Sequence, residues 1–490
     1  MSDAVPFAEL VLTVGVVGVL ALLSSRLSER SRLPSPILFL AASAAAVHLI
    51  PALHAPREQI VERVVTVALV CILFDGGMHI GWQRFRAAAA PIVVVGVLGT
   101  FLTVGAAALV CHALFGLSWY VALLLGTAIA PTDPVVVFSV LGGREIAGRS
   151  GTIIEGESGA NDPVGIALMA SLLTAGGLGG GAFVHIGTRF ALEMGVGGAV
   201  GLAGGWALLW FMRRVSLPSE GLYPVRTLAC AFLIFGLATL VHGSGFLAVF
   251  VAGILVGDAR APFKREVERF HSAIAAIGEI VAFVVLGLTV DLSVLARPNV
   301  WVTGLVLGVI LAVVIRPLAV GLCLLPVDLS WAERAFVVFA GLKGAVPILL
   351  GGFLLTAGVP DPARLYGIVV VVVAFSVLVQ GSLVPTVARL LRLPMRTVEP
   401  SPWSLGVRLR DDPGGAQRLV VAAGSPADGQ TIDELTHLPS SPWVSFVVRD
   451  GAVLATRSDL RLTAGDVVLV LADPQSHADL AVTFEQPAPS

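Results

Sequence analysis

The chain has 490 residues, of which 56% are hydrophobic and 13% are charged, and its mean hydropathy is +0.91. Soluble domains carry about 25% charged residues, so these figures exclude an ordinary soluble enzyme and predict a membrane protein. The formal net charge of −2 gives no reason to expect a nucleic-acid partner. Residues 1–397 hold 25 Lys and Arg against 21 Asp and Glu, whereas residues 398–490 hold 6 against 12. A slightly basic membrane part is therefore followed by an acidic tail.

Thirteen apolar runs are predicted to cross the membrane, since a span needs about 20 mostly apolar residues. The first run has no basic segment before it, which favours a retained span over a cleaved signal peptide. The predicted spans cover residues 7–24, 35–52, 62–80, 88–113, 118–141, 152–175, 183–211, 223–241, 244–257, 271–290, 300–325, 333–357 and 364–391.

The basic residues of the short loops predict the orientation, because Lys and Arg favour the cytoplasmic side of a membrane. One set of alternating span ends carries Arg26, Arg30, Arg32, Arg84, Arg86, Arg144, Arg149, Arg213, Arg214, Arg260, Lys264, Arg265, Arg334, Arg389, Arg392 and Arg396. The opposite set carries few, chiefly Arg57, Arg63, Arg297 and Arg364. We therefore expect a multi-pass protein of the cell membrane with its N-terminus outside and its tail in the cytoplasm.

The composition changes abruptly after Pro394. We expect an all-α transmembrane domain over residues 1–395, a linker over 396–417 and a small cytoplasmic α+β domain over 418–490. The last of these is too small to be an enzyme of its own.

Short runs in the tail predict strands and one helix. Asp450-Gly451 is a strong hairpin-turn signal between two of the strands. The predicted strands cover residues 419–423, 444–448, 452–455 and 467–471, and the predicted helix covers 431–435.

The first polar stretch inside the apolar runs is Ala130-Pro131-Thr132-Asp133-Pro134. Two prolines so close together remove backbone donors and clash with the preceding turn, so the helix is predicted to break here. Broken helices at membrane depth occur where they line a cavity or are buried in protein. The break would free backbone carbonyls for a cation and place Thr132 and Asp133 beside it. The alternative is a structural kink in which Asp133 is a buried cap.

The second polar stretch runs from Glu157 to Pro163. At about 100° per residue, four of its oxygen-bearing side chains share one face of a helix: Glu157, Ser158, Asn161 and Asp162. Hard monovalent cations need such an oxygen shell. A buried carboxylate that titrates near neutral pH holds either a proton or a cation, and this competition is sufficient for exchange. The alternative is a polar packing seam between helices.

Two basic residues inside apolar runs are expected to balance these carboxylates. Arg316 precedes Pro317, and Lys343 lies in a second glycine- and proline-containing interruption, GLKGAVP at 341–347. Paired interrupted helices in corresponding halves point to a transporter site. We expect Arg316 to pair with Glu157, which leaves Asp162 as the free carrier. The alternative is that Arg316 extends to the cytoplasmic interface.

These stretches resemble the sodium/proton exchanger superfamily. The resemblance rests on PTDPVVVFSVL (131–141) and EGESGANDPVGIAL (155–168), and the Asn161-Asp162 pair is similar to that of the first cation–proton antiporter family, the NhaP/NHE group. FDGG (74–77), VAFVVLGLTVD (281–291) and GLKGAVPILL (341–350) resemble that family's other recurring stretches. The resemblance covers roughly residues 7–392.

The resemblance implies thirteen spans with inverted repeats, a homodimer, and a core domain that moves against a dimerisation domain. It also implies electroneutral one-for-one exchange, because Asn161 stands where a second family has an Asp. Lys343 departs from the Arg of many relatives, so it keeps the charge without the bidentate fork. The cation site implied by the resemblance has Thr132, Glu157, Ser158 and Asp162 as ligands of Na⁺ or K⁺, Asp133 nearby, and Asn161 orienting the site.

The tail resembles the TrkA-C module, which accompanies potassium channels and potassium/proton antiporters. The resemblance rests on GQTIDELTHLP (429–439), VSFVVRDGAVL (444–454) and LTAGDVVLVLADP (462–474). Some modules of this kind bind nucleotides or dimerise, so a nucleotide ligand of the tail is a hypothesis. The tail has no glycine-rich phosphate loop after a strand.

The leading interpretation is a secondary antiporter that exchanges cytoplasmic K⁺ or Na⁺ for external H⁺ and is tuned by its tail. It needs no cofactor beyond the transported ions. The alternative is a ligand-gated monovalent cation channel, although the sequence has no TVGYG-like filter. A membrane sensor would leave the polar face of 157–162 unexplained. An enzyme is disfavoured, because no Ser/His/Asp or metal-ligand cluster appears outside the apolar runs.

Overall fold

A computed structural model describes Gly15, Gly18 and Val19 and residues 34–49, 57–141, 144–146, 149–259, 261–393, 395–397, 416–436, 443–449, 452–454, 456–471 and 477–485. The rest of the predicted first span, most of the predicted linker and the Asp450-Gly451 turn lie outside these residues. The chain divides into two compact units, Met1–Glu399 and Pro400–Ser490.

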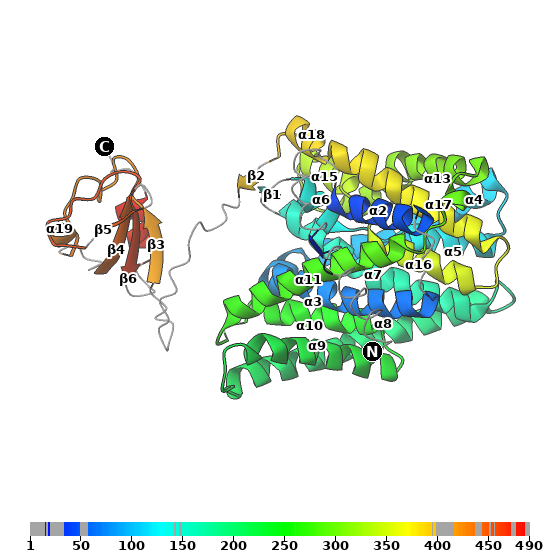
Figure 1. The fold of residues 1–490 in the computed structure, drawn as a ribbon, viewed down its shortest axis with the longest axis horizontal. Coiled ribbons are helices and arrows are strands. Elements are labelled where there is room, and N and C mark those ends of the chain that lie inside the picture. Colours follow the sequence, from blue (N-terminus) through cyan, green and yellow to red (C-terminus); the bar gives the residue numbers. More distant parts are fainter. Residues whose placement is uncertain are drawn as a thin grey trace, which may run out of the picture. The chain divides into compact units, whose positions relative to one another are not determined.

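The first unit is almost entirely helical (Figure 1). In its first half the helices are α2 (Ser35–Leu49), α3 (Glu58–Val93), the π-helical turn η1 (Val94–Gly99), α4 (Thr100–Phe115), α5 (Trp119–Ile129), α6 (Pro134–Val140) and α7 (Arg149–Ala175). The remaining ones are α8 (Ala182–Arg214), α9 (Leu222–Leu240), α10 (Gly245–Gly257), α11 (Lys264–Gly287), α12 (Leu292–Leu295), α13 (Pro298–Ile310), η2 (Leu311–Ile315), α14 (Arg316–Leu324), α15 (Trp331–Phe339), α16 (Ala345–Thr356), α17 (Pro362–Phe375), η3 (Ser376–Gly381) and α18 (Ser382–Leu390).

The helices of this unit form two groups with α7 between them. Helices α3, α8, α9 and α10 pack together along one side, and α5, α13, α16 and α17 pack together along the other (Figure 1). Helix α7 contacts α3 and α8 in the first group and α5 in the second. The polar stretch from Glu157 to Pro163 therefore lies in the interior of the bundle.

Six helices of the described part are long and apolar enough to cross a membrane, and α5 with α6, bent by 41°, would make a seventh span. Residues 58–115 count as one of the six, yet a straight helix of this length would extend for about 87 Å, against a hydrocarbon core of about 30 Å. This helix is kinked at Gly81, where φ is 66°, and at Ala88. Gly81 lies between the predicted spans 62–80 and 88–113, and Ala88 is the first residue of the second span.

The predicted break within 118–141 is confirmed, and a second break divides the predicted span 333–357. Helix α5 ends at Ile129 and α6 begins at Pro134, which occupies the first helical turn. Asp133 caps α6, since its Oδ1 accepts a hydrogen bond from the Val135 N–H at 2.9 Å. Helix α15 ends at Phe339 and α16 begins at Ala345. Helix α7, by contrast, continues through Pro163.

A short two-stranded sheet ties the end of this unit to the segment between α6 and α7. Strand β1 (Arg144–Ile146) pairs antiparallel with β2 (Met395–Thr397). Both strands were unpredicted, because three residues carry too little periodicity to indicate a strand.

The second unit is a small α+β domain, as predicted. Its antiparallel sheet has the order β3-β6-β4-β5. The elements are β3 (Ala416–Val420), α19 (Ile432–Thr436), β4 (Trp443–Arg449), β5 (Ala452–Leu454), β6 (Val467–Leu471) and α20 (His477–Phe484).

Two elements of this domain differ from the prediction. The predicted strand 419–423 is shifted, because Val421 N–H bonds to Asp466 O at 2.9 Å and Ala422 N–H bonds to Phe484 O at 2.8 Å, outside the strand ladder. Helix α20 was not predicted. Its Leu480 and Phe484 are fully buried in the core of the domain.

Asp466 is a buried side chain with several hydrogen bonds in this domain. Arg449 donates to both of its carboxylate oxygens at 2.7 Å, and the Thr463 N–H donates to it at 2.9 Å. Burial raises the pKa of the Asp466 carboxyl, but these bonds outweigh burial and hold the pKa below its usual value. The carboxylate therefore stabilises the folded domain above the usual pKa of Asp, and this stability is lost as the pH falls through the lowered pKa.

We predict that Asp466→Asn destabilises the tail domain by about 2 kcal/mol, the scale of hydrogen bonds to a charged group. Hydrogen–deuterium exchange of β4 and β6 in the full-length protein measures the loss. Asp459 is exposed, so Asp459→Asn is the matched control. Equal protection in the two variants at neutral pH would contradict the assignment.

Candidate functional site

The two helix breaks face each other inside the first unit. The Asp133 N–H donates to the Leu342 carbonyl at 2.8 Å, and the Lys343 ammonium donates to the carbonyls of Ala130 at 2.7 Å and Pro131 at 3.1 Å. The last carbonyls of a helix have no partner within the helix and carry partial negative charge. Lys343 therefore satisfies the open end of α5 in both hydrogen bonding and charge.

Glycines at two positions allow this close contact. A Cβ at position 344 would collide with the side chain of Asp133, and a Cβ at position 341 would collide with the guanidinium of Arg316. The two glycines of the GLKG stretch are therefore needed because the side chains of Asp133 and Arg316 pass directly over them. Both Lys343 and Arg316 are buried.

Thr132, in the first break, is held by the polar face of α7. The Asn161 Nδ2 donates to Thr132 Oγ1 at 2.7 Å, and the Thr132 N–H donates to Asn161 Oδ1 at 3.3 Å. The Ser158 hydroxyl donates to the Thr132 carbonyl. Asn161 and Ser158 thus fix the backbone and the hydroxyl of Thr132, and all three residues are buried.

Glu157 and Arg316 form a buried bidentate ion pair. The two guanidinium nitrogens donate to the two carboxylate oxygens at 2.8 and 3.0 Å, and the side chains are 3% and 6% exposed. Arg316 also donates to the carbonyls of Val338 at 2.7 Å and Val337 at 3.2 Å, near the end of α15. The predicted pairing is confirmed, and Arg316 does not extend to the membrane interface.

Asp162 lies one helical turn after Ser158 on the same face of α7, and it is 8% exposed. Its Oδ1 atom is buried without a hydrogen-bond partner among the described residues. Asp133 and Lys343 are the charged residues that interact with it electrostatically. The break between α5 and α6 thus supplies oxygen atoms of Thr132, and the adjacent face of α7 supplies those of Ser158 and Asp162. Oxygen atoms are the ligands that Na⁺ and K⁺ prefer.

The structure brings all eight predicted site residues to the region where α7 meets the two breaks. Asp133 is half-buried, and the other seven are buried: Thr132, Glu157, Ser158, Asn161, Asp162, Arg316 and Lys343. Across the described ranges, no three His, Cys, Asp or Glu side chains gather as around a transition metal.

Two residues that hold the second break were not predicted. The Lys343 N–H donates to Ser376 Oγ at 3.0 Å, Ser376 Oγ donates to Gln380 Oε1 at 3.1 Å, and Gln380 Nε2 donates to the Phe339 carbonyl at 2.7 Å. Both side chains are buried and lie in the π-helical turn η3. Two polar residues four positions apart in the apolar run 364–391 are the sequence signal that could have found them.

Comparison with known proteins gives two matches to family models and a set of relatives. Residues 18–390 match the transmembrane sodium/hydrogen exchanger family, and residues 416–484 match the TrkA-C domain. The K⁺/H⁺ antiporter NhaP of Alkalimonas amylolytica is 31% identical over 485 residues, which cover 98% of this chain and 84% of that protein. NhaP2 of Shewanella oneidensis, also a K⁺/H⁺ antiporter, is 32% identical over 86% of this chain and 73% of its own length.

A Na⁺/H⁺ antiporter, ApNhaP of Aphanothece halophytica, is 28% identical over 68% of this chain and 65% of its own length. Among solved structures, the sodium proton antiporter MjNhaP1 of Methanocaldococcus jannaschii at pH 8 has a TM-score of 0.66 and 21% identity. The likeness covers 76% of this chain and 100% of that chain, and it establishes the fold of the membrane unit.

We predict that Arg316→Ala destabilises the protein by about 3–5 kcal/mol, because it leaves the Glu157 carboxylate buried without its partner. Thermal unfolding of Arg316→Ala, Glu157→Ala and the double variant measures the coupling. The double variant should lose less than the sum of the single losses, and additive losses would contradict the pairing. Arg189→Ala, in the more exposed Arg189–Glu193 pair of α8, should cost about 0.5 kcal/mol.

Proposed function

The chain belongs to the sodium/hydrogen exchanger family and is a multi-pass monovalent cation/proton antiporter with a TrkA-C domain, not an enzyme; we propose that its Asp162 carries either the proton or the cation. The supporting observation is the unpartnered, buried Oδ1 of Asp162. The other two carboxylates of the site have fixed partners. Glu157 binds Arg316 through both oxygens, and Asp133 caps α6.

Formal charge supports an electroneutral one-for-one exchange. Three carboxylates, Asp133, Glu157 and Asp162, face two cations, Arg316 and Lys343. With the neighbouring Glu279 of α11, which interacts with Asp133, taken as protonated, the site has a formal charge of −1 when it holds neither ion. One proton or one monovalent cation neutralises it. Binding both would leave an uncompensated positive charge at membrane depth, which is costly.

We assign the cation shell to Thr132, Ser158 and Asp162, with Asn161 orienting Thr132. This differs from the shell that the family resemblance implies, which also includes Glu157 as a ligand. Both Glu157 oxygens accept from Arg316, so we assign Glu157 to holding the α14–α15 segment against α7.

For the architecture of the whole protein, we propose the arrangement that the sequence predicts. We propose thirteen spans with inverted repeats over residues 1–395, a linker over 396–417, and a cytoplasmic regulatory domain over 418–490. The N-terminus is outside, the protein is a homodimer, and the two breaks move with α7 as the core of an elevator-type cycle. Two relatives named as K⁺/H⁺ antiporters favour K⁺ over Na⁺ as the exchanged cation.

The strand that precedes the tail pairs with the segment between the two site-bearing helices. Strand β2 ends at Thr397, shortly before the boundary between the two units, and its partner β1 lies between α6 and α7. Helix α6 begins at its Asp133 cap, and α7 carries Asp162. We propose that the tail adjusts the position of these helices through the β1–β2 pair.

We predict that Asp162→Asn abolishes exchange while the protein stays folded, because the amide neither releases a proton nor binds a cation by charge. Purified protein in liposomes with an acid interior and a pH-sensitive dye receives KCl, NaCl or choline chloride, with and without a voltage clamp. Glu193→Gln, in an ion pair of α8 away from the site, is the control and should exchange normally.

Retained exchange in Asp162→Asn would move the carrier role to Glu157 or Asp133. The unmodified protein should dissipate the gradient independently of voltage, and more with K⁺ than with Na⁺. Proton movement that appears only as a voltage-driven consequence of cation leak would instead support the channel alternative.

We predict that removing residues 398–490, which keeps β2, leaves exchange intact but shifts its pH dependence. Removing residues 394–490, which also removes β2, should lower the maximal rate as well, because β1 loses its partner. Dye-reported rates over a pH series measure both effects in correctly inserted protein. Identical behaviour of the two truncations would contradict a role for the β1–β2 pair.

A further inference from the structure

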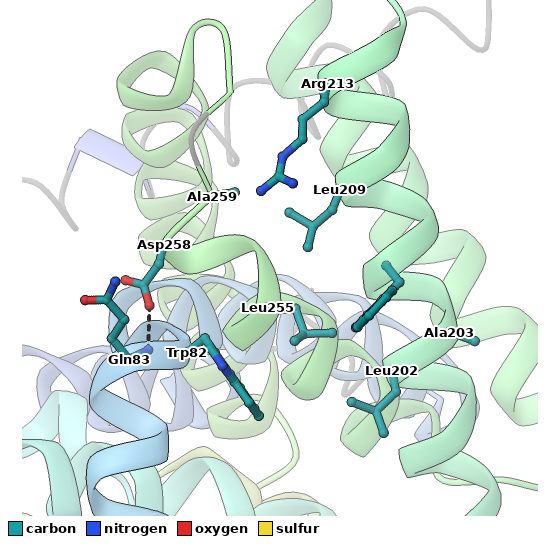
Figure 2. A pocket seen from close by; sticks show the side chains of 10 residues that line it. Trp82, Gln83, Leu202, Ala203, Leu209, Arg213, Leu255, Asp258 and Ala259 are labelled. Carbon is teal, nitrogen blue, oxygen red and sulfur yellow. Dashed lines mark hydrogen bonds between the residues drawn. The ribbon is translucent and has the colours of Figure 1, made fainter. Parts of the chain in front are cut away.

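A groove of about 780 Å³ lies between α3, α8 and α10 (Figure 2), and none of its lining residues belongs to the two helix breaks. Leu202, Leu209 and Leu255 supply aliphatic surface, and Trp82 and Trp206 are 42% and 68% exposed. Helix α8 is one of the candidate spans, and only 22% of its most apolar window is buried. Such a surface at a membrane span requires an apolar occupant.

The groove also contains two opposite charges that do not pair with each other. Arg213 extends from the end of α8 into the groove, and Asp258 lies on the opposite wall after α10 (Figure 2). Asp258 Oδ2 accepts a hydrogen bond from the Gln83 N–H at 2.6 Å, and its Oδ1 has no such partner among the described residues. Arg213 has no ion-pair or hydrogen-bond partner in the described part of the chain.

These charges lie near a helix end and exposed tryptophans, a combination that suits a lipid headgroup. Arg213 and Arg214 end α8, and exposed tryptophans are typical of the interface between hydrocarbon and water. A guanidinium matches a phosphate bidentately, and a free carboxylate oxygen accepts from a primary ammonium. The apolar wall accommodates acyl chains below these groups.

We propose that this groove binds a phospholipid with an ethanolamine headgroup, its phosphate on Arg213, its ammonium on Asp258, and its acyl chain along Trp82, Trp206 and the leucines. Phosphatidylglycerol supplies the phosphate but offers no cation to Asp258. Phosphatidylcholine supplies a quaternary ammonium without N–H donors. The two charges of the groove thus select among three common phospholipids.

The test is thermal unfolding of the full-length protein in detergent with added phosphatidylethanolamine, phosphatidylglycerol or phosphatidylcholine. At equal concentration, a ligand that binds only the folded state raises the melting temperature more the more tightly it binds, so phosphatidylethanolamine should give the largest shift. Arg213→Gln should weaken its apparent affinity about tenfold, the scale of a charged hydrogen-bonding pair. Arg214→Gln, at the adjacent exposed position outside the groove, should change it less than about twofold.

Two further comparisons separate the contribution of the lipid headgroup to binding from that of the acyl chain. Asp258→Asn should abolish the preference for phosphatidylethanolamine over phosphatidylglycerol while keeping the response to phosphate. Trp206→Ala should weaken all three lipids, whereas Trp210→Ala, one turn away and also exposed, should not.

Equal shifts with all three lipids, or equal losses in Arg213→Gln and Arg214→Gln, would overturn the proposal. So would the absence of any lipid response. If Trp206→Ala instead dissociates a dimer in a molar-mass measurement and Trp210→Ala does not, a second copy of the chain covers the groove and the lipid proposal is wrong.

Discussion

The membrane unit depends on one constraint, which is that two broken helices must satisfy their open ends without water. Lipid offers no hydrogen bonds to free backbone groups, so each end needs a partner from the protein. Lys343 caps the carbonyls of Ala130 and Pro131, and the Asp133 N–H binds Leu342. Gln380 takes the Phe339 carbonyl. Each break therefore supplies hydrogen-bond partners for open backbone groups of the other, so the two breaks depend on each other.

This mutual satisfaction also determines which charges are free. Lys343 is held by carbonyls, while Arg316 and Glu157 neutralise each other. Two further carboxylates are Asp133, which is bound at the start of α6, and Asp162, whose Oδ1 has no hydrogen-bond partner among the described residues. A buried ion pair is weak evidence for stability by itself. Here its position joins α7 to α14 and α15, so it fixes the helix that carries Asp162 relative to the second break.

The sequence predicted those features that depend on local chemistry. Pro131 and Pro134 indicated the first break, and the helical spacing of Glu157, Ser158, Asn161 and Asp162 indicated the shared face. Pairing of Arg316 with Glu157 could be expected because few buried cations were available. The roles of Gly341 and Gly344 could not, because they depend on which side chains pass over them in three dimensions. The bonds of Ser376 to Lys343 and of Gln380 to Phe339 could not be predicted for the same reason, since each joins residues more than thirty positions apart in the chain.

The site combines residues of a continuous helix with residues of a broken one, and this combination suits an exchanger. Helix α7 is unbroken, so Ser158 and Asp162 keep a fixed spacing of one turn. Thr132 lies instead in the break between α5 and α6, where Ser158 binds its carbonyl and Asn161 binds its hydroxyl. In the proposed cycle, a small shift of the break against α7 changes the oxygen shell around the cation, while Ser158 and Asp162 keep their spacing. One site can therefore bind either ion and release it when the surrounding helices move.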